Sequence, residues 1–169
     1  MSMKKLYRNI LIVIIAVIAF FVLIIYSGIL GAGSYPYSQT YKFPASKDSL
    51  VNAIKRFKKN NPTYDPSKEI GTTDGMDENG NFYNCWIYCP EQKEIFFFVV
   101  LGDNDNIENS SIWLVSVNNG LSLGHWRTIN DDIGRSENLK QKALFCGEIL
   151  DKLKLNYKDD GNNAFVFWK

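Results

Sequence analysis

The sequence contains one histidine, His125, so any serine or cysteine nucleophile that needs an imidazole base must rely on this residue. It stands beside Trp126 and Arg127 in an apolar stretch, and no nucleophile motif lies near it. A histidine in such a stretch more often forms structural hydrogen bonds than removes a proton from a substrate. His125 is therefore a candidate general base without an evident nucleophile.

A polar segment at residues 62–81 supplies carboxylates, among them Asp74 and Asp77. Two carboxylates that converge can act as acid and base in hydrolysis. Aspartate is also a residue that turns favour, so these side chains fit ordinary loops as well. We accordingly expect binding rather than catalysis, and keep as the alternative a hydrolase that uses Asp74, Asp77 and His125.

Metal, cofactor and nucleic-acid sites are not predicted. One histidine and three separated cysteines, Cys85, Cys89 and Cys146, provide no closely spaced pair of zinc ligands. No glycine-rich phosphate loop or dinucleotide fingerprint occurs. Three of the nineteen basic residues lie before residue 10, which leaves sixteen against eighteen acids and a net charge of −2 for the rest. This charge disfavours a nucleic-acid surface, and we expect no metal and no cofactor.

An apolar run at residues 10–30 is long enough, as a helix, to cross a bilayer core of about 30 Å. Lys4, Lys5 and Arg8 precede it, so the positive-inside rule predicts a cytoplasmic N-terminus. The small residues at 31–33 leave cleavage of a signal peptide open as an alternative. We therefore expect a single-pass protein of the inner, cytoplasmic membrane, with its C-terminal part outside, in the periplasm if the source is a Gram-negative bacterium.

Four parts of the chain follow from this prediction. They are a cytoplasmic basic tail at 1–9, a transmembrane helix at 10–30, a juxtamembrane linker at 31–36 and an extracytoplasmic domain at 37–169. The last part has the size of one ordinary domain.

Within this domain the patterns predict an α+β fold with one antiparallel-rich sheet in the order β-α-β-β-β-β-α-β and both helices on one face. The expected helices cover 46–60 and 136–155, and the expected strands cover 37–43, 82–89, 95–101, 111–117, 121–129 and 164–168. The run 95–101 shows no alternation, which predicts a central strand with both faces covered. The segment 62–81, a partner protein or self-association could provide the second cover.

Asn119 and Gly120 predict a two-residue type I′ hairpin turn, because both tolerate the positive φ angles that this turn needs. The resulting register places Trp113 opposite Trp126 and assigns their face to the core. The opposite face is then an apolar surface that we take as the candidate binding face. It comprises Ile112, Leu114, Leu121, Leu123, His125 and Arg127.

The helix at 46–60 ends in a cluster of cations, namely Lys55, Arg56, Lys58 and Lys59. Close to a membrane these side chains could bind anionic lipid headgroups. Cations are also favoured at any helix C-terminus, where they face solvent. The cluster is therefore a candidate headgroup site with an ordinary structural alternative.

Together these patterns favour a membrane-anchored, extracytoplasmic binding module, with protection against or sensing of another protein as its role. The expected partners are the lipid bilayer, through residues 10–30, and either a protein or a second copy of the chain. The alternative function is a membrane-proximal hydrolase that uses loop carboxylates with His125.

Overall fold

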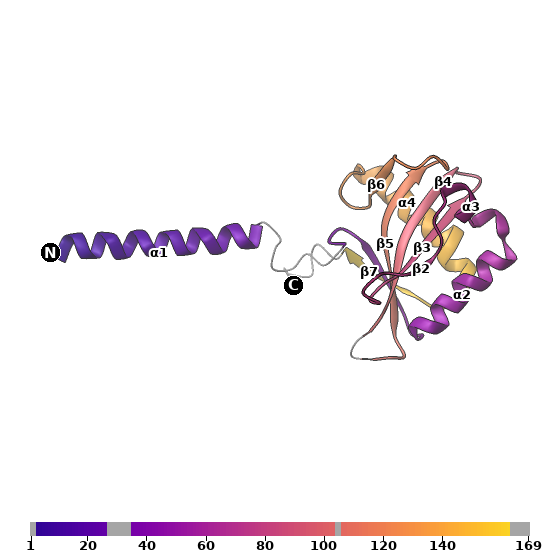
Figure 1. The fold of residues 1–169 in the computed structure, drawn as a ribbon, viewed down its shortest axis with the longest axis horizontal. Helices are drawn as coiled ribbons and strands as arrows, with labels where there is room; N and C mark the ends of the chain where they lie inside the picture. The colour runs from indigo at the N-terminus through magenta and orange to yellow at the C-terminus, as the bar shows by residue number, and fades with distance from the viewer. Residues whose placement is uncertain (1–2, 27–34, 104–105, 163–169) are drawn as a thin grey trace. The chain divides into compact units, whose positions relative to one another are not determined.

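The structure, a computed structural model, describes residues 3–26, 35–103 and 106–162 (Figure 1). The chain separates into two compact units, Met1–Ser34 and Tyr35–Lys169. The described part of the first unit is one helix, α1 (Met3–Tyr26). All other described elements belong to the second unit.

The predicted transmembrane helix is not supported. Over the described parts of the chain, no helix combines the length and the apolar character that crossing a membrane requires. α1 begins at Met3 rather than at residue 10 and ends at Tyr26 rather than at residue 30. The predictions of a transmembrane helix at 10–30, of single-pass topology and of a place in the inner membrane are therefore corrected. The possible cleavage site at 31–33 lies outside the described residues.

The second unit has an α+β fold with an antiparallel sheet, so this part of the predicted fold class is confirmed. Its strands lie in the order β2-β3-β4-β5-β1-β7, and β6 pairs with β5 beside this path. The strands are β1 (Gln39–Phe43), β2 (Gly75–Met76), β3 (Tyr83–Cys89), β4 (Glu94–Gly102), β5 (Ser110–Asn119), β6 (Trp126–Thr128) and β7 (Lys158–Asn162).

The helical segments are α2 (Lys47–Asn60), α3 (Ser67–Ile70) and α4 (Arg135–Phe145), with the short 3₁₀ turns η1 (Pro62–Tyr64) and η3 (Asp151–Leu153) and the π-helical segment η2 (Cys146–Leu150). α2 agrees with the prediction because Ser46 caps it, accepting a hydrogen bond from the Ser49 amide at 3.3 Å. The next turns place Leu50, Ile54 and Phe57 in the core.

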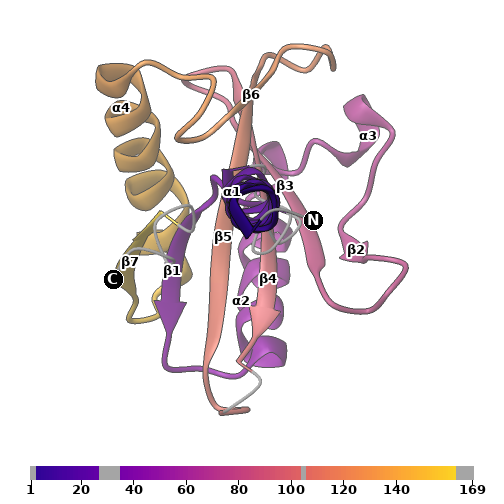
Figure 2. The ribbon, with the colours of Figure 1, turned by 90° about the vertical axis from the view of Figure 1, so that its left-hand side faces the viewer.

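The hydrophobic core lies between one face of the sheet and the helices. Phe96, Phe98 and Leu114 from the sheet belong to one buried cluster with Ile54 of α2 and Phe145 of α4. Figure 2 looks onto the other face of the sheet, with α2 seen behind β4 and β5. Both predicted helices therefore pack on one face, as the sequence indicates, and the opposite face carries no long helix in the described unit.

Two predicted elements differ from the structure. The helix expected at 136–155 is α-helical only to Phe145 and continues as η2 and η3, and within α4 Leu139 is 60% exposed, whereas Gln141 is buried. The last described strand, β7, forms at Lys158–Asn162, between the expected helix and the expected last strand. The strand expected at 164–168 lies outside the described residues.

Candidate functional site

The uncovered face of the sheet carries a cluster of aromatic rings. Trp86 of β3 and Phe97 of β4 are direct partners across the strands, and their rings stack with centroids 5.0 Å apart and an angle of 23°. Trp126 of β6 meets Phe97 edge-on, at 6.3 Å and 78°. The alternation of β3 and β4 produces this arrangement, because the neighbours of Trp86 and Phe97 along each strand point into the core.

A β-bulge in β5 widens this surface. Phe97 pairs with Ser116 but the next residue, Phe98, pairs with Leu114, so β5 holds one extra residue at this point. As a result Val115 and Ser116, although consecutive, both line the outer face. Ser116 also lies opposite Thr128 across the β5–β6 pair. Bulges often lie next to binding sites because they re-aim side chains in this way.

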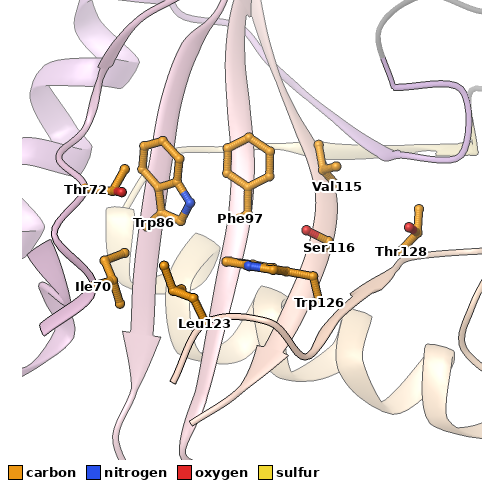
Figure 3. A pocket seen from close by; sticks show the side chains of 9 residues that line it. All are labelled: Ile70, Thr72, Trp86, Phe97, Val115, Ser116, Leu123, Trp126 and Thr128. Atoms are coloured by element: carbon orange, nitrogen blue, oxygen red, sulfur yellow. The ribbon is translucent and has the colours of Figure 1, made fainter. Parts of the chain in front are cut away.

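These side chains line an open hollow of about 430 Å³, within the usual size range of ligand sites (Figure 3). Figure 3 shows the rings of Trp86 and Phe97 face-on and side by side, and the ring of Trp126 edge-on beside them. The lining consists of Ile70, Thr72, Trp86, Phe97, Val115, Ser116, Leu123, Trp126 and Thr128. None of these nine side chains carries a charge, and three of them carry a hydroxyl group.

One wall of the hollow comes from the segment that the sequence marked as a long polar loop. It carries Ile70 and Thr72 and is held to α2 by a buried ion pair, in which Lys58 Nζ lies 2.7 Å from Asp74 Oδ2 and 3.4 Å from Asp65 Oδ1. The side chains of Lys58 and Asp74 are only 8% and 13% exposed. Asp74 Oδ1 also accepts a hydrogen bond from the backbone amide of Trp86 at 3.1 Å. The ion pair therefore fixes the loop directly beside the rings of Trp86, Phe97 and Trp126, which form the aromatic floor of the hollow.

A second wall is the connection between β5 and β6, which carries Leu123, and Figure 3 shows this side chain between Ile70 and Trp126. Asn118, whose side chain is fully buried, donates to the carbonyls of Gly120 and Ser122 at 2.9 and 3.1 Å. Its Oδ1 accepts a hydrogen bond from the amide of His125 at 2.9 Å. Gly124 has φ +121°, a backbone angle that residues other than glycine rarely adopt. One buried amide thus sets the path of the whole connection.

Beside the hollow, Tyr35 and Phe82 cover the next part of the same face. The Tyr35 ring lies 5.9 Å from Phe97 and 5.6 Å from Phe82, and Phe82 lies 6.1 Å from Trp113. Burial raises the pKa of Tyr35, and the negative charge of Asp77 adds to the effect. These rings help to explain why Val99 on this face of β4 is fully buried. The second cover that the sequence required therefore includes side chains of the same unit.

The two aspartates among the predicted catalytic residues make structural contacts, and His125 lies apart from them. Asp74 is paired with Lys58, and Asp77 closes a turn by accepting the Phe82 amide hydrogen bond at 2.7 Å. His125 is exposed on the connection between β5 and β6. Across the described part of the chain, no hydrogen bond or ion pair joins His125 to either aspartate. The structure therefore assembles no hydrolytic site from these three residues.

The predicted binding face is divided by the structure. Ile112 and Leu114 are fully buried beneath the helices, because Trp113 and not its neighbours points to the open face. The predicted turn is wrong as well: Asn118 pairs with Trp126, and residues 120–125 form a longer connection, so Trp113 does not lie opposite Trp126.

The other members of that predicted face have separate environments. Leu121 is half-buried, and His125 is exposed. Arg127 donates to Asn119 Oδ1 at 3.1 Å and lies 3.8 Å from Glu94 Oε1. Of the six predicted residues, Leu123 alone lines the hollow.

The four cations of α2 do not share one surface environment. Lys58 is buried in its ion pair, and Lys55 Nζ lies 5.5 Å from the centre of the Tyr83 ring. Arg56 and Lys59 are exposed. Lys58 is therefore unavailable to an external headgroup.

The structure describes no metal centre: among the side chains it describes, no group of three or more His, Cys, Asp or Glu residues is placed to hold an ion. The three cysteines are free thiols, with Cys85 and Cys89 buried. The chain matches no protein family model, no curated protein and no solved structure.

Sequence reasoning missed the aromatic floor: Trp86 lies in an alternating strand, but Phe97 lies in the unbroken apolar run 95–101, which does not show the face to which each side chain points. The signal that could have identified it is the presence of large aromatic residues at outward positions of two neighbouring strands. The walls have no comparable signal, because they depend on Lys58 and Asn118, whose burial only the tertiary structure produces.

Proposed function

We propose that the second unit is a binding module that holds an uncharged ligand group in the hollow over Trp86, Phe97 and Trp126 and does not transform it. The observation that supports this proposal most is the construction of the two walls. A buried ion pair at Lys58 and a buried amide at Asn118 fix them beside an open aromatic floor. Preorganisation of this kind reduces the entropy that binding must otherwise overcome.

The lining supports binding rather than chemistry. It offers aromatic faces and hydroxyls but no ionised acid, base or thiol. A general base must reach the proton that it removes, and no such group lines the hollow. The alternative of a hydrolase with His125, Asp74 and Asp77 gains no supporting observation.

The proposal can be tested with the indole N–H signals of the full-length chain, recorded by two-dimensional ¹H–¹⁵N NMR. Methyl β-D-glucopyranoside, cellotetraose and N-acetyl-L-tryptophanamide serve as uncharged probes. We expect at least one probe to shift the Trp86 and Trp126 signals in a saturable manner. Trp113 provides an internal control, because it lies on the same face but outside the lining of the hollow.

A matched pair of variants completes the test. Trp86→Ala should abolish the saturable shift of Trp126, whereas Trp113→Ala should leave it intact, with both variants checked for an unchanged fold by circular dichroism. If no probe moves the Trp86 and Trp126 signals, or if all indole signals shift equally, the hollow is not a binding site and the proposal fails.

A further inference from the structure

The hollow contains three hydroxyl groups, two of which the fold itself does not use. Thr72 lies on one wall, and Ser116 and Thr128 lie opposite each other on β5 and β6. The Thr128 hydroxyl bonds to the Asp132 carboxylate. Among the residues that the structure describes, the hydroxyls of Thr72 and Ser116 make no hydrogen bond. A hydroxyl can both donate and accept, so Thr72 and Ser116 are free to serve a ligand.

The charges next to the hollow, by contrast, are already paired. Asp74 lies against Lys58, and Arg127 contacts Glu94 and Asn119. A charged ligand would find no opposite charge in the lining and would lose its hydration on an aromatic floor. The occupant should therefore be neutral.

From this combination we infer that the ligand is a neutral saccharide, bound with one pyranose ring on the Trp86 and Phe97 faces; this inference rests on the proposed function. A pyranose ring presents a flat face of C–H groups, which carry partial positive charge and pack on the negative face of an aromatic ring. Its hydroxyls project around the edge of that face. They would meet the free hydroxyls of Thr72 and Ser116 at the edges of the floor.

An aromatic side chain of a peptide is the competing occupant. It would stack on the same floor, but it would remove water from the Thr72 and Ser116 hydroxyls without replacing those hydrogen bonds. Leaving a polar group unsatisfied costs more than a typical hydrogen bond contributes, so the hydroxyl edge favours a ligand that is itself hydroxylated. The aromatic rings can stack with either ligand, and the hydroxyl groups beside them favour the saccharide.

The experiment titrates the full-length chain with neutral tetrasaccharides and, separately, with N-acetyl-L-tryptophanamide, with the indole N–H shifts as the readout. The panel contains cellotetraose, maltotetraose, chitotetraose and laminaritetraose. We expect at least one tetrasaccharide to shift Trp86 and Trp126. Thr72→Val and Ser116→Ala should each weaken its binding about three- to tenfold, the value of one hydrogen bond, and leave any binding of N-acetyl-L-tryptophanamide unchanged. Ser122→Ala, on an exposed position outside the lining, is the matched control.

The outcomes separate the two proposals. Binding of N-acetyl-L-tryptophanamide at Trp86 and Trp126 with no response to any tetrasaccharide would overturn the saccharide inference and retain the binding module. Saccharide binding that ignores both hydroxyl variants would overturn the role given to the hydroxyl edge. Failure of every probe to shift these two indoles would overturn both proposals.

Discussion

Asn118 is a polar residue with no exposed surface, and its hydrogen bonds go to the connection that carries Leu123. Asn118→Ala removes these bonds and leaves the amide of His125 and the carbonyls of Gly120 and Ser122 without their partner. We expect a loss of about 2 kcal/mol in the free energy of unfolding, measured by urea titration, and a weaker response of the hollow to its ligand. Asn119→Ala, at the exposed neighbouring position, is the matched control and should change stability much less.

Lys58 is the second residue at which burial and charge coincide. Lys58→Met keeps most of the side-chain volume but leaves Asp74, which is 13% exposed, without its partner at 2.7 Å. Because an unpaired buried charge is costly, we expect a loss of about 3 kcal/mol in the free energy of unfolding. Lys59→Met on the exposed side of α2 should be nearly neutral in the same urea titration. Equal effects of the two substitutions would show that the ion pair does not hold the wall.

At the scale of elements, the π-helical segment η2 is tied to η1 through Glu148. Its carboxylate accepts hydrogen bonds from Lys152 and from the Tyr64 hydroxyl, and these bonds lower its pKa. A lowered pKa means that this contribution to stability is complete above the ordinary value of 4.5 and is lost as the pH falls through the lowered value.

Because the site is partly exposed, we expect Glu148→Gln to reduce the free energy of unfolding by only about 0.5 kcal/mol at pH 7. The reduction should become smaller as the pH falls below 4, since the native carboxylate is then protonated. Urea midpoints recorded from pH 3 to 7 check this pH dependence. Glu91→Gln, at an exposed position, provides the control. A difference from the native chain that grows in acid would contradict the assignment.

The elements also show where sequence reasoning succeeds. α2 could be predicted because its cap, Ser46, and its apolar stripe are local signals that agree with its tertiary environment. The central place of β4 could be predicted from the unbroken apolar run at 95–101. Each of these features depends on residues close together in the chain.

Sequence reasoning fails where one element departs from its ideal period. The bulge at Val115 and Ser116 changes the phase of β5, so Trp113 and Val117 point to opposite faces although strict alternation places them on the same one. The helix predicted as continuous over 136–155 likewise changes from α-helical to π-helical after Phe145, and the apolar Leu139 is exposed while the polar Gln141 is buried. The candidate site was missed for the same reason. Strict alternation along β5 assigns the face that carries Trp113 to the core, whereas in the structure this is the open face and Ile112 and Leu114 are buried.

At the scale of the whole second unit, the core is one cluster that joins the sheet to both helices, and it contains two thiols. Cys85 and Cys89 are fully buried in this cluster, and Cys146 lies partly exposed at its edge. Burial raises the pKa of the Cys85 thiol and raises the pKa of the Cys89 thiol to about 12. Since the thiolate is the reactive form, both groups lack access and ionisation at neutral pH.

We therefore expect one of the three thiols to react quickly with Ellman's reagent in the native chain at pH 8, and the other two to react only as the unit unfolds in urea. The Cys146→Ser variant should remove the fast phase and leave the slow one, which assigns the reactive group. Because the slow phase requires opening of the shared core, its urea dependence should coincide with that of global unfolding followed by circular dichroism. Fast reaction of all three thiols in the native chain would show that β3 opens separately from the rest of the core. In that case the floor of the hollow, which β3 carries at Trp86, would not be the rigid platform that the binding proposal requires.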